Sequence, residues 1–223
     1  MNLSRFVIDR KFRLPRVWSN DELRRMGSLF AGRVVNVSAW KDEDKEGGFY
    51  RDYFPNAESY HFTNYSGDAG FQGMDEEIFL DLTGTLPDEL VGAFDVVFNH
   101  TTLEHIFDVM KAFENICAMS NDLVVIVLPF AQIQHETTTW KDYWRFTPSW
   151  VREAFGRQDM EVLYVSANND KNAAVYVYAV ASKHPERWVG KLPKSPLDTM
   201  AAHWLGRSRW RTAVTLAAKK LRR

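Results

Sequence analysis

The sequence has one cysteine, no long apolar run and almost no net charge, and each shortage excludes a class of protein. Cys117 is the only cysteine among 223 residues, which excludes a disulfide framework and a metal site built from several thiolates. The longest apolar runs, residues 123–131 and 173–181, are too short to cross a bilayer as helices. The formal net charge of −1 gives no reason to expect nucleic acid as the overall partner.

The composition is that of one globular domain, with 45% apolar and 26% charged residues. The N-terminal residues are rich in charge and lack the apolar core of a secretory signal, so we expect a cytoplasmic protein. The charges are distributed unevenly. Residues 183–223 hold eleven Lys and Arg against two acidic side chains, whereas the preceding residues hold an excess of Asp and Glu. We therefore divide the chain into a domain over residues 1–182 and a basic, helical C-terminal extension over 183–223.

Hydrophobic periodicity predicts strands alternating with helices. A helix is expected over residues 21–31, capped by Ser19 or Asn20, and a second over 103–117, where apolar residues follow helical spacing. A third helix is expected from Thr147, with Pro148 in its first turn. Strands are predicted over residues 33–39, 59–65, 77–82, 94–99, 123–128, 161–165 and 173–181.

The strand over residues 123–128 is apolar throughout, which is typical of a strand buried on both faces of a parallel sheet. The last two strands are joined by a turn-rich segment. These features predict an α/β fold with a Rossmann-like, seven-stranded, mostly parallel and doubly wound sheet that ends in an antiparallel hairpin. In such sheets, ligands bind beyond the carboxyl ends of the strands.

Polar residues follow several of the predicted strands. Ser38 and Ala39 end the first strand, Asn64 lies near the end of the second, Asp81 lies in the third, and Asn99 with His100 ends the fourth. A nucleoside-like ligand laid across the strand ends would need polar groups in this arrangement.

The segments 81–87 and 94–106, which includes Leu103-Glu104-His105, resemble the central signature of class I S-adenosylmethionine-dependent methyltransferases. Residues 32–38 stand where that family has its first strand and glycine-rich turn. Downstream, residues 123–129 and 142–148, with Tyr143-Trp144-Arg145, are similar to a subgroup associated with glycan biosynthesis. The resemblance covers residues 20–181.

This resemblance implies a methyl donor, S-adenosylmethionine, bound at the ends of the first four strands. By position, residues from Asn36 through Ser38 to Ala39 would pass under the methionine part and Asn64 would face the ribose. Asp81 and Leu82 would border the adenine, and Asn99 with His100 would line the reaction side.

Two features depart from the family pattern. Asn36, Ser38 and Trp40 replace the acidic residue and the glycines of the turn, although glycine lets a backbone approach a ligand closely. Asn64 or Tyr65 stands where the family has an acid that accepts the ribose hydroxyls. A polar loop over residues 41–48 follows Trp40, and we expect this loop, together with Trp40, to close over the donor.

Two histidines are candidates for catalysis. His100 follows a strand and could deprotonate a substrate hydroxyl, or it could instead cap the next helix or bond within a loop. His135 lies in the loop after the fifth strand and could reach the same cleft, or belong to a solvated surface loop. No second pair of ligands at metal spacing accompanies His135 and Glu136, so no metal site is predicted.

The segment Tyr143-Trp144-Arg145 combines aromatic faces with a guanidinium, which suits binding of a sugar or aromatic acceptor. The alternative is structural: Trp144 packs under the next helix and Arg145 pairs with Asp142. In residues 207–223 the apolar side chains share one helical face, which is typical of a helix on an anionic membrane surface or of a helix packed on the domain.

Two functions follow from these observations. The first is a methyltransferase that modifies a hydroxyl of a glycan-type or lipid-linked acceptor, cytoplasmic and with peripheral membrane contact through residues 207–223. The second is a catalytically inactive protein of the same fold that serves in binding or as a scaffold.

Overall fold

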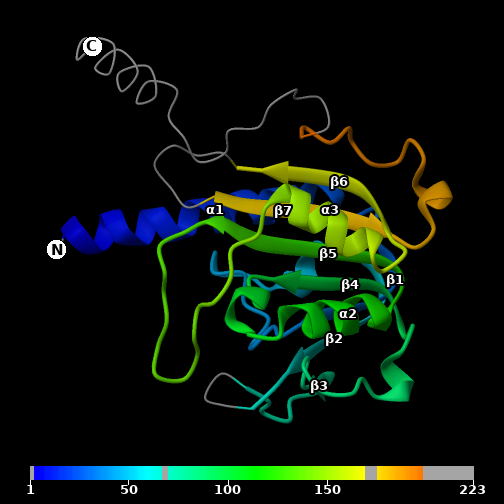
Figure 1. Ribbon diagram of the computed structural model, residues 1–223, viewed down its shortest axis with the longest axis horizontal. Coiled ribbons are helices and arrows are strands. Elements are labelled where there is room, and N and C mark those ends of the chain that lie inside the picture. Colours follow the sequence, from blue (N-terminus) through cyan, green and yellow to red (C-terminus); the bar gives the residue numbers. More distant parts are fainter. Residues whose placement is uncertain (1–2, 67–69, 169–174, 198–223) are drawn as a thin grey trace.

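The computed structural model describes residues 3–66, 70–168 and 175–197, with side chains from residue 14 onwards. These residues build a seven-stranded sheet in the order β3-β2-β1-β4-β5-β7-β6 (Figure 1). The strands are β1 (Ala31–Val37), β2 (Asn56–Asn64), β3 (Glu77–Phe79), β4 (Phe94–His100), β5 (Ser120–Ala131), β6 (Glu161–Ala167) and β7 (Val175–Ser182). The ends differ from the predicted ones by at most three residues. β1 to β5 are parallel to one another, and β7 is antiparallel to both β5 and β6, so the predicted fold class is confirmed.

Helices cover both faces of the sheet. α2 (Val109–Met119) and α3 (Pro148–Gly156) lie on one face, and α1 (Leu3–Gly27) crosses the other (Figure 1). The valines of β1 alternate between the two cores: Val35 and Val37 belong to the cluster under α2 and α3, and Val34 belongs to the cluster under α1. Burial on both faces explains the unbroken apolar pattern of the central strands.

The first predicted helix is wrong at both ends. α1 begins before Ser19 and Asn20, which lie inside it, and it ends at Gly27 instead of residue 31. Ser19 and Asn20 resemble capping residues in sequence, but their side chains make tertiary contacts: Ser19 Oγ lies 2.9 Å from His100 Nε2, and Asn20 Nδ2 donates to Asp44 O at 3.1 Å. Pro15 also lies within the helix, where it removes one backbone hydrogen bond.

The second predicted helix begins later than expected. Leu103–His105 form a 3-10 turn, η3, and α2 starts at Val109 with Asp108 as its N-cap. The Asp108 carboxylate accepts the Lys111 N–H at 3.4 Å. The third helix agrees with the sequence, because Thr147 caps α3 by accepting the Trp150 N–H at 3.1 Å. The start of α2 therefore differs from the prediction, as both ends of α1 do, whereas the start of α3 agrees with it.

The connections from β1 to β2 and from β2 to β3 contain unusually little helix. Residues 38–55, between β1 and β2, contain only the 3-10 turn η1 (Tyr50–Tyr53), and the described part of the β2–β3 connection contains no helix. Parallel strands are usually joined through an α-helix. Here three buried aromatic side chains of the first connection, Tyr50, Tyr53 and Phe54, cover the sheet together with α1.

The stretch after β7 packs on the domain. η4 (Pro185–Trp188) places the Trp188 indole N–H 3.1 Å from Asp122 Oδ2. Ser195 Oγ accepts from the Val165 N–H at 3.2 Å and donates to Val165 O at 2.6 Å, and Leu197 is buried in the core under α2 and α3. The domain boundary predicted at residue 182 therefore falls inside the packed region. The helix predicted over 207–223 lies outside the described residues.

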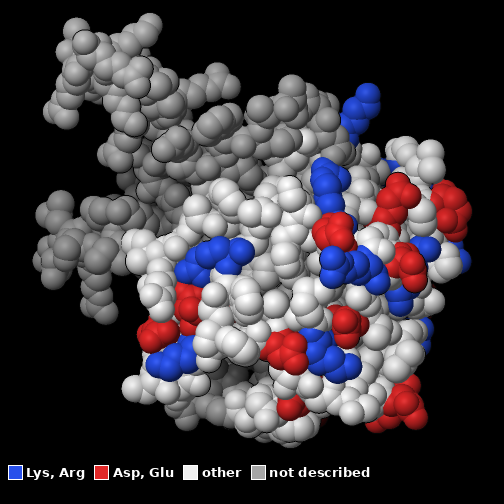
Figure 2. Space-filling model, viewed as in Figure 1, with Lys and Arg blue, Asp and Glu red and all other residues white. Residues whose placement is uncertain are grey.

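Charge and hydropathy agree with this picture. None of the described helices combines the length and the apolar character that a membrane span requires. On the face of α2 and α3, Lys and Arg side chains lie among Asp and Glu side chains rather than in one patch (Figure 2). Cys117 is a free, buried thiol of α2.

The contact between the end of α1 and η1 can be tested at Gly27. A Cβ at this position would lie 1.9 Å from Tyr53 O, so Gly27→Ala forces the helix end and the turn apart. We expect a loss of about 1–3 kcal/mol in the free energy of unfolding, measured by chemical denaturation. Gly156→Ala, at the end of α3 with no atom within 4 Å of the added Cβ, is the control and should change stability little. Equal stability of both variants would contradict the close contact.

Candidate functional site at the carboxyl ends of the strands

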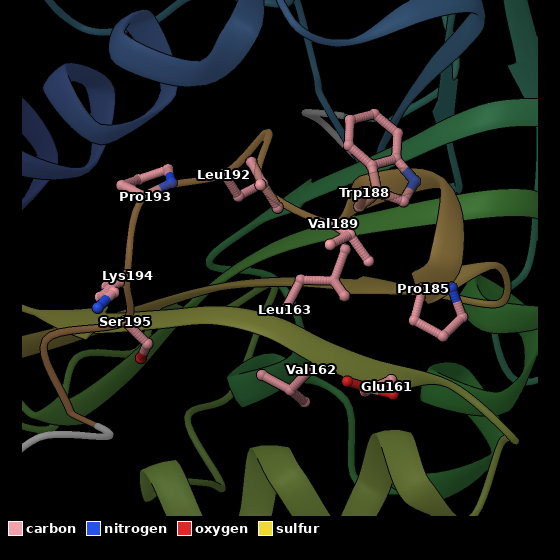
Figure 3. A pocket seen from close by; sticks show the side chains of 11 residues that line it. Glu161, Val162, Leu163, Pro185, Trp188, Val189, Leu192, Pro193, Lys194 and Ser195 are labelled. Atoms are coloured by element: carbon pink, nitrogen blue, oxygen red, sulfur yellow. The ribbon is translucent and has the colours of Figure 1, made fainter.

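Two clefts are lined by described residues other than Ser38, Asn64, Asn99 and His100. A cleft of about 460 Å³ lies beside the amino end of β6, and its lining includes Leu163 of β6 and Trp188, Val189 and Leu192 from the chain after β7 (Figure 3). A second, of about 400 Å³, lies beside β2 and is lined by Phe62, Phe49 and Arg51 among others. Neither contains the polar residues that the sequence placed after β1 and β4. In open α/β sheets the ligand site is expected at the carboxyl ends of the strands, so the residues there are described next.

The turn after β1 adopts left-handed backbone conformations without glycine. Ser38, Trp40 and Asp42 have φ values of 58°, 53° and 62°. Non-glycine residues in this region are strained, so the surrounding contacts must hold them there. The N–H groups of the turn bond to β2: Ser38 N donates to Thr63 Oγ1 at 3.1 Å, and Ala39 N donates to Thr63 O at 3.1 Å.

Asn64 completes this attachment. Its Oδ1 accepts the Trp40 N–H at 2.7 Å, and its Nδ2 donates to Trp40 O at 2.9 Å and to Glu77 Oε1 at 2.6 Å. The Asn64 side chain is therefore buried and bonded through both its oxygen and its nitrogen. We call this arrangement the Asn64–Trp40 clasp. It uses the group that the sequence had predicted to face a ribose.

Asn36 points into the loop that follows. Its Nδ2 donates to Asp42 Oδ1 at 2.8 Å, and the Tyr60 hydroxyl donates to the same oxygen at 2.6 Å. Asp42 is buried, and burial raises the pKa of its carboxyl group. Asp44 holds the next part of the loop by accepting the N–H groups of Glu46 and Gly48. The loop over 41–48, predicted as a lid, is therefore fastened by two buried carboxylates.

The residues predicted for the adenine lie next to β3. Asp81 is half-buried, and its Oδ1 accepts the N–H and the hydroxyl of Thr83, each at 2.8 Å. Leu82 is buried. Asn99, at the end of β4, is fully buried; its Nδ2 donates to Val37 O at 2.9 Å, and its Oδ1 has no partner among the described residues. The sheet thus brings Asn36 and Asn99 to neighbouring strand ends, as expected from their positions.

His100 belongs to a closed ring of hydrogen bonds between β4 and α1. Ser19 Oγ donates to Arg16 O at 2.9 Å, so it must accept from His100 Nε2 at 2.9 Å. The His100 ring is thereby protonated on Nε2, and its Nδ1 accepts from Thr101 Oγ1 at 3.0 Å. Arg16 Nη2 donates to the same Thr101 oxygen at 3.2 Å. We call this set the Arg16–His100 ring.

Both nitrogens of His100 are therefore bonded within the protein. Burial and the nearby Arg16 charge lower the pKa of His100 well below its usual value, which keeps the imidazole neutral. In this arrangement His100 joins α1 to β4. The catalytic role predicted from the sequence would require Ser19 or Thr101 to move away first.

Glu104 is the most unusual group near the strand ends. Its side chain is 1% exposed, and Oε2 has no hydrogen-bond partner among the described residues. Burial raises the pKa of this carboxyl group to about 8, so it is mostly protonated at pH 7. His105 Nε2 lies 3.7 Å from Glu104 Oε1, and its Nδ1 donates to Lys141 O at 2.6 Å. A neutral acid and a neutral imidazole therefore lie side by side.

His135 does not contact His100 through any bond that the structure describes; it lies in a separate cluster. The His135 and His105 ring centroids are 5.1 Å apart, and Trp140 is in edge contact with both. The backbone N–H of His135 donates to Asp142 Oδ2 at 2.7 Å. Arg145 donates to both oxygens of Asp142, at 2.5 and 2.7 Å, and these bonds contribute to lowering the pKa of Asp142 to about 2.

The segment predicted to bind an acceptor is thus partly structural. Arg145 pairs with Asp142, as the alternative, structural interpretation of this segment predicted. The N–H groups of Tyr143 and Trp144 donate to Glu104 O, and the Trp144 indole donates to Ile106 O at 3.0 Å. The aromatic faces remain available, because Phe107, Tyr143 and Trp144 are all exposed and their rings are in contact.

The residues at the strand ends fit the adenine end of an adenosyl donor but, as they are bonded in this structure, not its ribose end. Asp81 uses Oδ1 for Thr83, and no other bond to its carboxylate is present in the described parts of the chain, so Oδ2 can accept from an adenine amine. At the other end, the backbone N–H groups of Ser38, Ala39 and Trp40 are bonded to β2, and Asn64 is bonded to Trp40. The clasp must therefore open before a ribose could reach Asn64. Within the described residues, no three His, Cys, Asp or Glu side chains are grouped to hold a metal ion.

No protein-family model and no curated protein matches the sequence. Solved structures do match the fold. Magnesium protoporphyrin IX methyltransferase from Synechocystis PCC 6803 with bound SAM is 9% identical over 79% of this chain and 83% of that chain, with a TM-score of 0.52. The 1,6-didemethyltoxoflavin-N1-methyltransferase of Burkholderia thailandensis, with bound 1,6-didemethyltoxoflavin and S-adenosylhomocysteine, is 16% identical over 81% of this chain and 86% of that chain, with a TM-score of 0.51.

The cyclase SpnF has the same fold, at 11% identity, with 75% of this chain and 80% of that chain covered and a TM-score of 0.52. This chain therefore has the Rossmann-like fold of class I methyltransferases. At such low identities the likeness concerns the fold alone, and a cyclase among the matches indicates that the fold does not determine the reaction.

Sequence reasoning assigned no role at these strand ends to Arg16, Ser19, Glu104 or Tyr176 of β7, whose ring centroid lies 6.1 Å from that of His100. Arg16 and Ser19 lie in a stretch that precedes the predicted first helix, so no signal placed them near β4. The spacing of Arg16, Ser19 and Leu23 is that of one helix face, and this pattern could have been found by extending the helix window towards the N-terminus.

The buried Glu104 predicts a pH dependence of stability. The folded-state pKa of about 8 lies above the ordinary value of 4.5 for this side chain, so the folded protein binds the proton more tightly than the unfolded chain. Stability should therefore fall as the pH rises from about 4.5 to about 8 and then level off. Glu104→Gln should remove this loss of stability. Above pH 8 its free energy of unfolding, measured by urea denaturation across pH, should exceed that of the wild type by about 3–5 kcal/mol.

The exposed Glu89 provides the control, since Glu89→Gln should follow the wild-type curve. If Glu104→Gln also followed that curve, Glu104 would be ionised without penalty in the folded protein and the assigned protonation would be incorrect.

Proposed function

We propose that this chain is an S-adenosylmethionine-dependent methyltransferase that binds its donor across the carboxyl ends of β1 to β4 and modifies a hydroxyl of a glycan-type or lipid-linked acceptor. The observation that carries the proposal is the strand order with an antiparallel β7, together with polar side chains at the ends of β1, β2 and β4. Solved proteins of this fold with bound SAM or S-adenosylhomocysteine support the donor assignment.

When bound, the donor would supply an electrophilic methyl group. Asp81 and Leu82 would hold its adenine, and Asn99, through its unpartnered Oδ1, would lie at the centre of the site. The exposed aromatic faces of Phe107, Tyr143 and Trp144 favour a sugar or another flat acceptor, because aromatic rings bind sugar faces and planar groups. Arg145 would position this segment through Asp142 rather than contact the acceptor.

A second function is favoured by the Asn64–Trp40 clasp. The bonds of Asn64 to Trp40 and Glu77 occupy the group that would face a ribose, and the strained turn lacks glycine. A protein with this clasp permanently closed would be a catalytically inactive binding or scaffold protein. Donor affinity separates the two functions before any acceptor is known.

The decisive measurement is a calorimetric titration with S-adenosylmethionine and S-adenosylhomocysteine. We expect both to bind the wild type and Asp81→Ala to weaken binding by about 1–3 kcal/mol, the usual cost of a lost hydrogen bond to a charged group. Asp88→Ala, which removes an exposed carboxylate of the nearby 3-10 turn, is the matched control. Absence of heat from either ligand with the wild type would favour the scaffold, and unchanged affinity in Asp81→Ala would remove Asp81 from the site.

Contact with a membrane is proposed for residues 207–223, on the basis of their basic and apolar pattern alone. Full-length protein should bind vesicles that contain phosphatidylglycerol and bind them less as salt rises, because each nearby Lys or Arg contributes about 1 kcal/mol that salt screens. A chain shortened after Leu197 should keep its core, since Leu197 is buried in it, and should lose vesicle binding. Equal sedimentation of both chains with anionic and neutral vesicles would exclude this contact.

A further inference from the structure

Arg16 is a cation placed among neutral partners. Nη1 donates to the Tyr50 hydroxyl at 3.0 Å and Nη2 donates to Thr101 Oγ1 at 3.2 Å. Within the part of the chain whose side chains are described, no carboxylate forms an ion pair with Arg16. Other arginines differ in this respect: Arg24 and Arg25 of α1, Arg33 of β1 and Arg145 of the loop before α3 each pair with an acid.

The groups around Arg16 do not compensate its charge. Glu104, the acid whose charge would act on Arg16, is mostly protonated at pH 7 because burial raises its pKa to about 8. Tyr50 and Tyr176 also lie close to Arg16, and burial raises the pKa of both phenols, so they stay neutral. A half-buried charge without a counter-charge is costly unless something else supplies the charge.

The position of Arg16 is set by α1. Ser19 and Leu23 follow it on one face of the helix, and Leu23 and Met26 anchor this face in the core. Because the end of α1 leads into the start of β1, the earlier turns of the helix lie over the carboxyl ends of the strands. The Arg16–His100 ring holds the guanidinium there, next to Thr101 after β4 and near Tyr176 at the start of β7.

We propose that Arg16 binds an oxyanion, a carboxylate or a phosphate, of a molecule held at the ends of β4 and β7. Arginine suits this role because its planar guanidinium can donate two parallel hydrogen bonds to such a group. The site can exist without the proposed methyltransferase function. The identity of the molecule rests on that function, since the anion belongs either to the methionine part of the donor or to the acceptor.

The first experiment tests the anion site with simple probes. Thermal unfolding of the full chain is followed in sodium phosphate, sodium acetate and sodium chloride at equal ionic strength. Phosphate and acetate should raise the wild-type melting temperature relative to chloride, Arg16→Gln should abolish this rise, and Arg16→Lys should keep part of it. Arg33→Gln removes an arginine that is paired with Asp95 at the other end of the sheet, so it should respond like the wild type.

An equal response of the wild type and Arg16→Gln to these anions, or no response of the wild type, would overturn the proposal. Circular dichroism monitors the fold of each variant. Should Arg16→Gln fail to fold, the reduced response of Arg16→Lys relative to Arg33→Gln still decides, because a lysine cannot reproduce the planar pair of donors.

The second experiment identifies the source of the anion by calorimetry with S-adenosylhomocysteine and 5′-methylthioadenosine, which shares the adenosine but lacks the carboxylate. If the anion is the carboxylate of the donor, Arg16→Gln should weaken the binding of S-adenosylhomocysteine about tenfold or more and leave the affinity for methylthioadenosine unchanged. If both affinities are unchanged while the phosphate response is lost, the anion belongs to the acceptor. If neither nucleoside binds the wild type but the phosphate response depends on Arg16, the anion site stands and the methyltransferase proposal fails.

Discussion

The contact between α1 and the end of β4 is the constraint on which the site depends. Ser19, His100, Thr101 and Arg16 form a closed set of hydrogen bonds in which each buried donor meets an acceptor. Buried polar groups are tolerated only when they are bonded in this way, so the ring fixes the height of α1 above the sheet. It also fixes the protonated nitrogen of His100. A change in this ring would move α1 and the guanidinium it carries, and would expose the end of β4.

The short connections on the α1 side have a second consequence. Where a helix would normally follow β1, the chain turns back through strained residues and packs three aromatic side chains on the sheet. The Asn64–Trp40 clasp and the buried carboxylates of Asp42 and Asp44 hold this turn in place. The same bonds that stabilise the turn without glycine therefore consume the N–H groups that a ligand would need. Stability of the turn and access to it are in direct competition.

The fold and the chemistry are separate conclusions. The strand order and the antiparallel β7 identify the architecture, and proteins of that architecture include methyltransferases and a cyclase. The reaction depends on side chains at the strand ends, where this chain has a neutral Glu104 beside His105, a clasped Asn64 and an uncompensated Arg16. These groups, rather than the sheet, determine which chemistry the strand ends can carry out.

The sequence by itself determined the seven strands and the cap at Thr147, because these follow from local periodicity and from a side chain that bonds to nearby backbone. It also placed Asn36, Asn64 and Asn99 at strand ends. Only the tertiary structure decided what those side chains do. Ser19 and Asn20 have the chemistry of helix caps, but His100 and Asp44 are separated from them in sequence and can bond to them only after the sheet forms. The same holds for Glu104, whose protonation is set by burial, a property that no local pattern records.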